Sequence, residues 1–343
     1  MEAPVNQVKR RRRLFAVIAL LFCASLARAA EPRVLIVSID GCRPDVALRA
    51  DMPYFRWLMR NGCFTFLATT TPAAITLPSH TSMLTGVTIE RHGISGNDDE
   101  AAEDQQLKVP TIFDLAKKAG ISSGMASGKS KFVLYDPPID HSWHPNSKPA
   151  TRKSKTTGQI ISYSAGTVVT DDVVADHAVE IIEKYSPRLM FVHFGYNDSI
   201  GHSKGWGSAA QVAGLANTDA ALGRVIVALK DKGVLDQTTI ILSADHGGAG
   251  RVHGAKVVGS AFIPWIIVGP GVRKNVDLSQ YNSWPVQTYD TFATACDVLG
   301  LQTPPGIDGT NVAPAFEATD LLSSTTRPTG TAAGSTTTPA TQP

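Results

Sequence analysis

The chain has 343 residues, of which 43% are hydrophobic and 18% are charged, so it can bury a large core. Its formal net charge is +2, but residues 1–30 alone hold six Lys or Arg and one acidic residue. The rest carries 26 basic and 29 acidic residues, a net charge of −3, which argues against nucleic-acid binding by bulk charge.

The first 30 residues have the pattern of a secretory signal peptide. A basic run at residues 9–13 precedes an apolar stretch at 14–26 and the small-residue sequence Ala-Arg-Ala at 27–29. The apolar stretch is short for a stable membrane span, although an uncleaved anchor is an open alternative. We therefore expect export to the periplasm or the extracellular space. After cleavage three cysteines would remain (Cys42, Cys63 and Cys296), which is no disulfide framework but allows one bridge.

Alternating strand and helix patterns begin at residue 33. Residues 33–40 (RVLIVSID) form a continuous apolar run closed by Asp-Gly, which is typical of a parallel strand buried on both faces. A helix is predicted over residues 44–60, with Pro44 in its first turn. Further helices are predicted over residues 110–119, 168–185, 209–232 and 289–299, and further strands over 189–194, 238–242 and 265–268. The alternation predicts an α/β fold in which helices flank both faces of a mostly parallel central sheet.

Two regions depart from this alternation. Residues 97–166 are rich in Asn, Asp, Ser, Lys and Pro, and we expect an irregular, cap-like excursion over the site. Residues 318–343 are rich in Ser, Thr, Pro, Ala and Gly and have too little apolar mass to bury a core, so a disordered tail is predicted. The folded domain is therefore expected to span residues 31–317.

Aspartates stand at or just after the ends of three predicted strands, and three histidines accompany them. In parallel sheets, ligands bind beyond the carboxyl ends of the strands. Three carboxylates and three imidazoles are a usual ligand set for Zn²⁺ or a similar divalent ion. Each residue alone has an ordinary explanation, such as a helix cap or a surface histidine, but their joint occurrence predicts a two-metal site. The set comprises Asp40, Asp198, His202, Asp245, His246 and His253.

A hydroxyl-rich segment, TPAAITLPSHTSMLTG, occupies residues 71–86. Pro78 suits the first turn of a helix, which places Thr76 near the N-terminus of that helix. Backbone N–H groups there favour anionic phosphoryl oxygens, and a hydroxyl becomes a nucleophile when a metal or a base activates it. From chemistry alone Thr76 could also be a plain helix cap. The equally hydroxylic neighbours are Ser79, Thr81, Ser82 and Thr85.

From about residue 34 to 309, these motifs resemble the type I phosphodiesterase/nucleotide pyrophosphatase family of the alkaline phosphatase superfamily. That family's Asp-Gly strand end is matched by residues 40–41, and its Thr-Phe-Pro-Asn-His nucleophile segment by residues 76–80. Asp-x-x-Gly-His is matched by residues 198–202, Asp-His-Gly by 245–247 and His-Gly by 253–254. The resemblance implies an alkaline phosphatase-like fold.

The resemblance also implies a role for each matched residue. Asp198, His202 and His253 would hold one ion, and Asp40, Asp245 and His246 would hold the other. Thr76 would bind beside the second ion as the nucleophile, and Asn97 matches an asparagine whose amide contacts a phosphoryl oxygen. The implied activity is cleavage of phosphodiester or pyrophosphate bonds in a small phosphorylated substrate. It would proceed through a phospho-threonine intermediate, with two divalent ions as cofactors, Zn²⁺ first among them.

Two departures from the family pattern leave the substrate open. Only residues 248–252 separate the Asp-His-Gly and His-Gly segments, where nucleotide-cleaving relatives have a long insertion, and Ser79 replaces the family's Asn. The sequence Lys-Ser-Lys resembles the Lys-x-Lys of phosphonate-hydrolysing members. Lys129 and Lys131 are thus candidate substrate contacts, although alternating lysines on a loop are usually just solvated.

Two other functions are alternatives. A phosphonate or phosphomonoester hydrolase would use the same metal centre, and a non-catalytic metal- or phosphate-binding protein would keep the ligands without turnover. Sulfatases of the superfamily place a modifiable cysteine at the nucleophile position. Cys42 lies in a different segment and lacks the Cys-x-Pro-x-Arg context, which argues against sulfatase activity.

Overall fold

The computed structural model describes residues 31–98, 106–146, 148–153, 160–165, 168–281 and 285–317. The signal peptide predicted at residues 1–30 and the tail predicted at 318–343 lie outside these residues, so both stay predictions. Among the described residues, the strands of the main sheet are β1 (Arg33–Ile39), β2 (Cys63–Thr69), β3 (Ser123–Ser127), β4 (His141–Trp143), β7 (Leu189–Phe194), β8 (Thr238–Ser243), β9 (Phe262–Val268) and β10 (Val276–Asp277).

These strands lie in the order β10-β2-β9-β8-β1-β7-β3-β4. All neighbouring strands pair in parallel except β9, which is antiparallel to both β8 and β2. The backbones of β5 (Lys148–Lys153) and β6 (Ile160–Ala165) form a separate antiparallel pair. The prediction of a mostly parallel central sheet is therefore confirmed.

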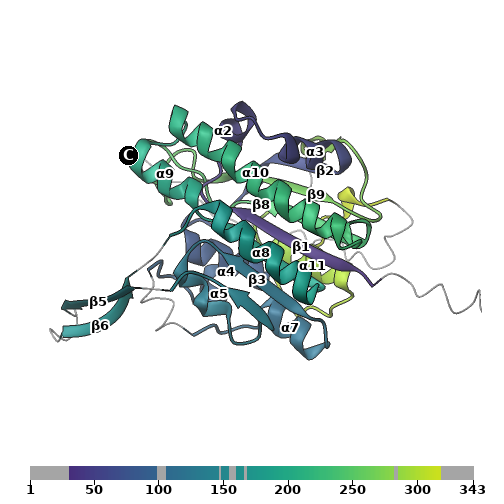
Figure 1. The fold of residues 1–343 in the computed structure, drawn as a ribbon, viewed down its shortest axis with the longest axis horizontal. Coiled ribbons are helices and arrows are strands. Elements are labelled where there is room, and N and C mark those ends of the chain that lie inside the picture. Colours follow the sequence, from purple (N-terminus) through teal and green to yellow (C-terminus); the bar gives the residue numbers. More distant parts are fainter. Residues whose placement is uncertain are drawn as a thin grey trace, which may run out of the picture. The chain divides into compact units, whose positions relative to one another are not determined.

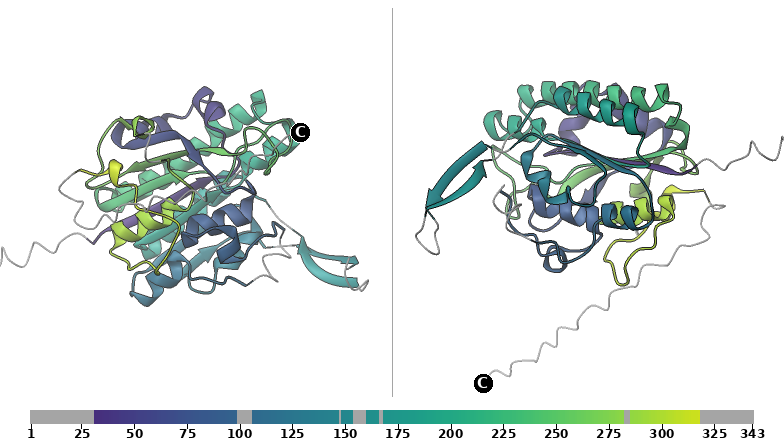
Figure 2. Two further views of the ribbon diagram at one scale, coloured as in Figure 1. Left: turned by 180° about the vertical axis from the view of Figure 1, so that it is seen from behind. Right: turned by 60° about the horizontal axis from the view of Figure 1, so that its bottom comes forward.

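Helices lie on both faces of the sheet, as Figures 1 and 2 show. One layer contains α2 (Pro44–Arg49), α3 (Pro53–Asn61), α8 (Asp171–Tyr185), α9 (Tyr196–Lys204) and α10 (Ala209–Asp231). The other contains α4 (Thr76–Thr85), α5 (Ile89–His92), α7 (Ile112–Lys118) and α11 (Asp290–Leu299). By length and composition α10 could cross a membrane. It packs against α8, α9 and α3, however, and 61% of its most apolar 18-residue window is buried, as in a core helix.

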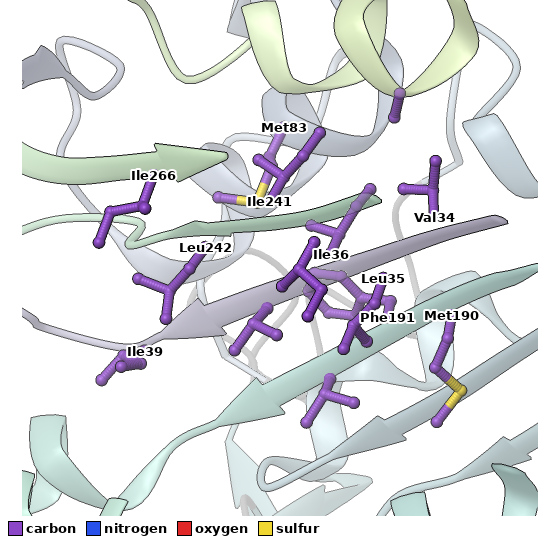
Figure 3. Packing of buried hydrophobic residues seen from close by; sticks show 14 of the residues in the cluster. Val34, Leu35, Ile36, Ile39, Met83, Met190, Phe191, Ile241, Leu242 and Ile266 are labelled. Carbon is purple, nitrogen blue, oxygen red and sulfur yellow. The ribbon is translucent and has the colours of Figure 1, made fainter. Parts of the chain in front are cut away.

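The three central strands, β8, β1 and β7, are apolar because helices cover them on both sides. Every residue of β7 and β8 is buried, and so is every residue of β1 after Arg33. Figure 3 shows Leu35 and Ile36 of β1 beside Phe191 of β7 and Ile241 of β8. Ile39 pairs with the last residue of β7, so the strands end together and the segments after them emerge at one edge of the sheet.

Two predictions about local structure are wrong. The single helix predicted over residues 44–60 is two helices, because Pro53 starts α3 and disfavours helical backbone at Met52 before it. Residues 97–166 are not one irregular excursion, because α7, β3 and β4 within this range belong to the helix and sheet layers.

Three cysteines lie in the described part of the chain, and all of them are buried and free (Cys42, Cys63 and Cys296). The single disulfide that the sequence allowed is therefore not formed among them. Burial raises the pKa of Cys42 to about 12 and that of Cys63 to about 11, so both are protonated thiols at neutral pH. They serve as small apolar side chains of the core.

Candidate metal centre and active site

The three predicted aspartate ligands lie at the carboxyl ends of the central strands. Asp40 directly follows β1, Asp245 lies two residues after β8, and Asp198 lies in the first turn of α9, after β7. The N–H of Gly41 donates to Asp245 Oδ1 at 3.0 Å and thereby orients that carboxylate. Gly41 has a φ of +69°, and a Cβ there would lie 3.2 Å from Asp198 and from Trp206, so this position favours glycine.

The three predicted histidine ligands are all oriented through Nδ1, which lies within hydrogen-bond distance of a backbone carbonyl. Because a carbonyl oxygen can only accept, Nδ1 carries the proton and the lone pair is on Nε2. Histidines that bind metals usually donate their other N–H in this way. The pairs are His202 with Arg251 (3.0 Å), His246 with Gly247 (2.9 Å) and His253 with Ala74 (2.9 Å).

Asp198, His202 and His253 form the first candidate metal group. Asp198 and His202 are four residues apart on α9 and therefore lie on the same face of the helix. Asp198 Oδ1 lies 3.4 Å from His202 Nε2 and 3.8 Å from His253 Nε2. Two ligands of one tetrahedral zinc ion are about 3.4 Å apart, so these atoms have the spacing of ligands to a shared ion.

The resemblance predicts Asp40, Asp245 and His246 as the second group, whereas the ligand atoms that lie within 4.8 Å of one another in the structure belong to Asp40, Asp198 and His246. His246 Nε2 lies 3.2 Å from Asp245 Oδ2 and 3.6 Å from Asp40 Oδ1. Burial lowers the pKa of His246 to about 4, so the ring is neutral at pH 7 and cannot donate from Nε2. The two groups in the structure therefore share Asp198, and Asp245 adjoins the second group through its contact with His246.

Four of these ligand atoms are buried and have no hydrogen-bond partner: Asp40 Oδ1, Asp198 Oδ1, Asp245 Oδ2 and His246 Nε2. Leaving buried acceptors unsatisfied is costly, and carboxylate oxygens repel a lone pair that faces them. Divalent cations bound at these atoms would satisfy them. The residues present therefore fit the metal ions that the sequence predicts.

Lys129 lies between the two groups. Its Nζ is 2.6 Å from Asp40 Oδ2 and 2.8 Å from Asp198 Oδ2, and its side chain is 6% exposed. Burial is the largest influence and opposes ionisation of Asp40 and Asp198, but the Lys129 ammonium together with the neighbouring histidines outweighs it and holds the pKa of each carboxyl below its ordinary value. Burial and the neighbouring charge of Asp40 raise the pKa of Asp245 well above its ordinary value. The sequence predicted Lys129 and Lys131 as substrate contacts, whereas the Lys129 ammonium pairs with metal-ligand candidates.

Thr76 is the first residue of α4 and lines an open cavity of about 610 Å³, together with Asp198, His202 and His253. Asn97 lines the same cavity.

Asn97 is held so that its amide nitrogen can act on a ligand. Its Oδ1 accepts a hydrogen bond of 2.8 Å from the N–H of Leu77, which leaves the Nδ2 group as a donor. Lys131 Nζ donates to the backbone carbonyl of Asn97. Lys131 thus contacts the asparagine and also lines the cavity, where it remains a candidate substrate contact.

The other hydroxyls of the segment form hydrogen bonds inside the protein. Thr81 and Thr85 each donate at 2.7 Å to a carbonyl one turn earlier on α4. Ser79 Oγ lies 2.8 Å from Thr71 Oγ1, and Ser82 Oγ lies 3.1 Å from His92 Nε2. Among these five described hydroxyl residues, Thr76 alone lines the cavity, and the structure thereby separates alternatives that residue chemistry left open.

Sequence reasoning missed two histidines that support the site. His193 Nε2 donates to Asp40 Oδ2 at 2.9 Å, and the same oxygen is also in contact with Lys129 Nζ. His80 Nδ1 donates to the carbonyl of Thr76 at 2.8 Å, and its Nε2 lies 2.7 Å from Ser38 Oγ. A histidine in the otherwise apolar run LMFVHF is a signal that could have pointed to His193.

Trp206 is a further supporting residue that the sequence did not reveal. Its Nε1 donates at 2.9 Å to the carbonyl of Gly41. Its ring packs edge-on against His202 and His253, with centroid distances of 5.1 and 5.8 Å. Trp206 therefore packs against both histidines of the first candidate metal group. No motif in the sequence marks this residue.

Comparison with known proteins yields relatives of two kinds. A family model described as type I phosphodiesterase / nucleotide pyrophosphatase matches residues 34–259. The Xenopus laevis bis(5'-adenosyl)-triphosphatase enpp4 is 24% identical over 254 residues, which are 68% of this chain and 52% of that protein. Danio rerio arylsulfatase K is 30% identical over 118 residues, 33% of this chain and 22% of that protein. The chain thus matches about a fifth to a half of the length of these curated relatives.

Solved structures of both kinds share the fold. A murine ectonucleotide pyrophosphatase / phosphodiesterase 5, as an inactive variant in complex with AMP, aligns with a TM-score of 0.64 and 17% identity over 84% of this chain and 100% of that chain. A 2-O GAG sulfatase aligns with a TM-score of 0.65 and 17% identity, over 83% of this chain and 74% of that chain. These alignments confirm the alkaline phosphatase-like fold. Since the family model matches more than half of its residues, the chain belongs to the type I phosphodiesterase / nucleotide pyrophosphatase family.

Proposed function

We propose that the protein is an exported two-metal hydrolase that cleaves phosphodiester or pyrophosphate bonds, with Thr76 as the nucleophile. The observation that carries the proposal is the set of four buried ligand atoms without hydrogen bonds, beside a cavity that Thr76 lines. The family match supports hydrolysis of phosphate esters. The triphosphatase named among the relatives and the AMP bound by a structural neighbour favour a small phosphorylated nucleotide as substrate.

Two divalent ions, with zinc the first candidate, fit the donor atoms. Asp198, His202 and His253 would hold one, and Asp40, Asp245 and His246 would hold the other. Bound ions of this kind supply Lewis-acid stabilisation of negative charge on oxygen and lower the pKa of a hydroxyl. The remaining steps concern the protein's own residues.

Thr76 Oγ attacks phosphorus in line with the departing oxygen, so that a phospho-threonine forms and the leaving group is released. Water then displaces Thr76 from phosphorus and regenerates the hydroxyl. The backbone of Thr76 is held during both steps, because its carbonyl accepts from His80 Nδ1 at 2.8 Å. Holding the backbone limits the positions that the Thr76 hydroxyl can take, so less freedom is lost on reaching the transition state.

Negative charge that develops on the phosphoryl oxygens is stabilised by Asn97 and by the N-terminus of α4. The Leu77 N–H is occupied by Asn97 Oδ1 at 2.8 Å, so Asn97 Nδ2 is the donor that faces the substrate. An oriented donor of this type stabilises the transition state without any rearrangement.

A phosphomonoester or phosphonate hydrolase is the second candidate function. Lys131 lines the cavity and adds a positive charge to it, which favours a substrate with a further negative charge. Sulfate esters are disfavoured, because Thr76 stands where a sulfatase would need its modifiable cysteine. Cys42 is fully buried and belongs to a different segment.

The test compares kcat/KM for aryl phosphodiester, phosphomonoester, phosphonate and sulfate substrates that share one leaving group. We expect the phosphodiester to be the best substrate. Thr76→Ala should lower its hydrolysis at least about 10³-fold while metal content stays unchanged. Thr81→Ala is the matched control, because this hydroxyl lies on the same helix and bonds the Leu77 carbonyl instead of lining the cavity.

The outcomes separate the candidate functions. Activity of the Thr76→Ala variant close to that of the wild type would refute the nucleophile assignment. A wild type that binds metal and hydrolyses none of the four esters would support the non-catalytic reading. Export is tested separately, by sequencing the N-terminus of protein recovered outside the cytoplasm. We expect it to begin near residue 31, and an intact residue 1 would contradict cleavage.

A further inference from the structure

We propose that Lys129 is a built-in cation of the metal centre. It bridges one carboxylate of each candidate metal group and thereby limits how tightly the centre binds divalent ions. This inference rests on the proposed two-metal site. Lys129 then acts within the metal centre, instead of only contacting the substrate from a loop as the sequence predicted.

The two oxygens of each bridged carboxylate have different tasks. Lys129 Nζ contacts Oδ2 of Asp40 at 2.6 Å and Oδ2 of Asp198 at 2.8 Å. Oδ1 of each aspartate is buried without a hydrogen-bond partner and lies close to the histidine Nε2 atoms. Lys129 therefore joins the two groups while it leaves one oxygen of each carboxylate to a metal ion.

The aliphatic part of the Lys129 side chain packs closely against Gly195. Lys129 follows β3, whose neighbour β7 ends just before Gly195. A Cβ on Gly195 would lie 3.2 Å from Lys129 Cγ and 3.5 Å from Cε, so glycine at this position leaves room for the aliphatic stem. The N–H of Lys129 also donates to Ser127 Oγ at 3.2 Å. This packing distinguishes Lys129 from a solvated lysine on a flexible loop.

The charge of Lys129 has opposite effects on the metal-free and the metal-loaded protein. The Lys129 ammonium lies between the carboxylates of Asp40 and Asp198, within ion-pair distance of both. In the metal-free protein it offsets part of the negative charge of three buried aspartates. In the loaded protein it repels the bound ions at short range. A group that stabilises only the metal-free state lowers metal affinity by linkage.

Lys129→Met tests this role, because methionine keeps an unbranched apolar stem and removes the charge. Zinc affinity is measured by competition with a chelator, and melting temperatures are measured with and without zinc. We expect the variant to bind zinc at least about tenfold more tightly than the wild type. We also expect its melting temperature to fall more in the metal-free than in the loaded protein. Lys131→Met is the control, since this lysine lines the same cavity but bonds the Asn97 carbonyl, and both quantities should stay near wild type.

Zinc binding by the Lys129→Met variant that is unchanged or weaker would overturn the inference. If this variant does not fold without metal, Lys129→Gln is measured in its place, because glutamine keeps N–H donors for the carboxylates without a charge. Zinc binding by the wild type separates failure of the two-metal site from failure of the role of Lys129. A wild type that binds no zinc refutes the two-metal site itself, whereas equal affinity of wild type and variant refutes only the role of Lys129.

Discussion

Asp171 is a buried carboxylate whose charge is expected to make the protein less stable as pH rises. It is the first residue of α8 and is 5% exposed. Thr218 Oγ donates to its Oδ2 at 2.6 Å, and the N–H of Tyr196 donates to its Oδ1 at 3.1 Å. The carboxylate therefore links α8 to α10 and to the first residue of α9, the helix that carries Asp198.

Burial raises the pKa of Asp171 from 3.8 to about 6, although both hydrogen bonds oppose the increase. Between these values the folded protein keeps a proton that the unfolded chain has already released. Stability therefore falls as pH rises through this window, and the full cost is present above about pH 6. The difference between the two pKa values corresponds to about 3 kcal/mol of unfolding free energy.

Asp171→Asn removes the titration and keeps the shape of the side chain. Its Oδ1 can still accept from Tyr196, and its Nδ2 can donate to Thr218 Oγ. We would measure urea unfolding of wild type and variant in a chelator at about pH 4.5 and about pH 7.5. Between about pH 4.5 and about pH 7.5, the free energy of unfolding of the variant should rise by about 2 kcal/mol relative to that of the wild type. The exposed Asp172→Asn variant on the same helical turn should show no such gain.

A free-energy difference between wild type and Asp171→Asn that stays constant across this pH range would refute the reasoning. It would mean that the Asp171 carboxylate ionises in the folded protein as it does in the unfolded chain. Burial of the Asp171 carboxylate would then not reduce the free energy of unfolding when the group ionises.

Three further predictions concern the site. His193→Ala removes the hydrogen bond to Asp40 and should weaken zinc binding about 10- to 100-fold in a chelator competition, and unchanged binding would argue against this support. Asn97→Ala should lower kcat/KM about 10²-fold with metal content unchanged, whereas loss of metal would contradict its assignment as a substrate contact. Removing metal from the wild type should lower the melting temperature, and added zinc should raise it with concentration. A melting temperature that is insensitive to zinc would speak against the centre.

The positions of the metal-ligand candidates could be predicted because their signals are local and strong. Asp40, Asp198 and Asp245 each follow an apolar run that forms a buried parallel strand, and such strands end at one edge of a sheet. What the sequence could not provide is the order β8-β1-β7, which brings the three aspartates side by side. Strand order depends on long-range packing that no local pattern encodes.

Other elements were missed for physical reasons that differ from one to the next. The residues of β3, Ser123–Ser127, read SGMAS and have no strand pattern, because neighbouring layers rather than side-chain propensity hold this strand in the sheet. Its position also determines that of Lys129, so the ion pairs of this lysine with two aspartates were invisible in the sequence. Trp206 was missed because its contacts join segments far apart in the chain.

The proposed centre consists of two groups of three residues that hold two divalent ions. The direct measurement is the zinc content per chain, by elemental analysis after reconstitution and removal of free metal. We expect two zinc ions per chain in the wild type, and about one each in His202→Ala and in His246→Ala, since each variant removes a ligand from one group. A wild type that retains one ion or none, or variants that retain as much zinc as the wild type, would contradict this expectation.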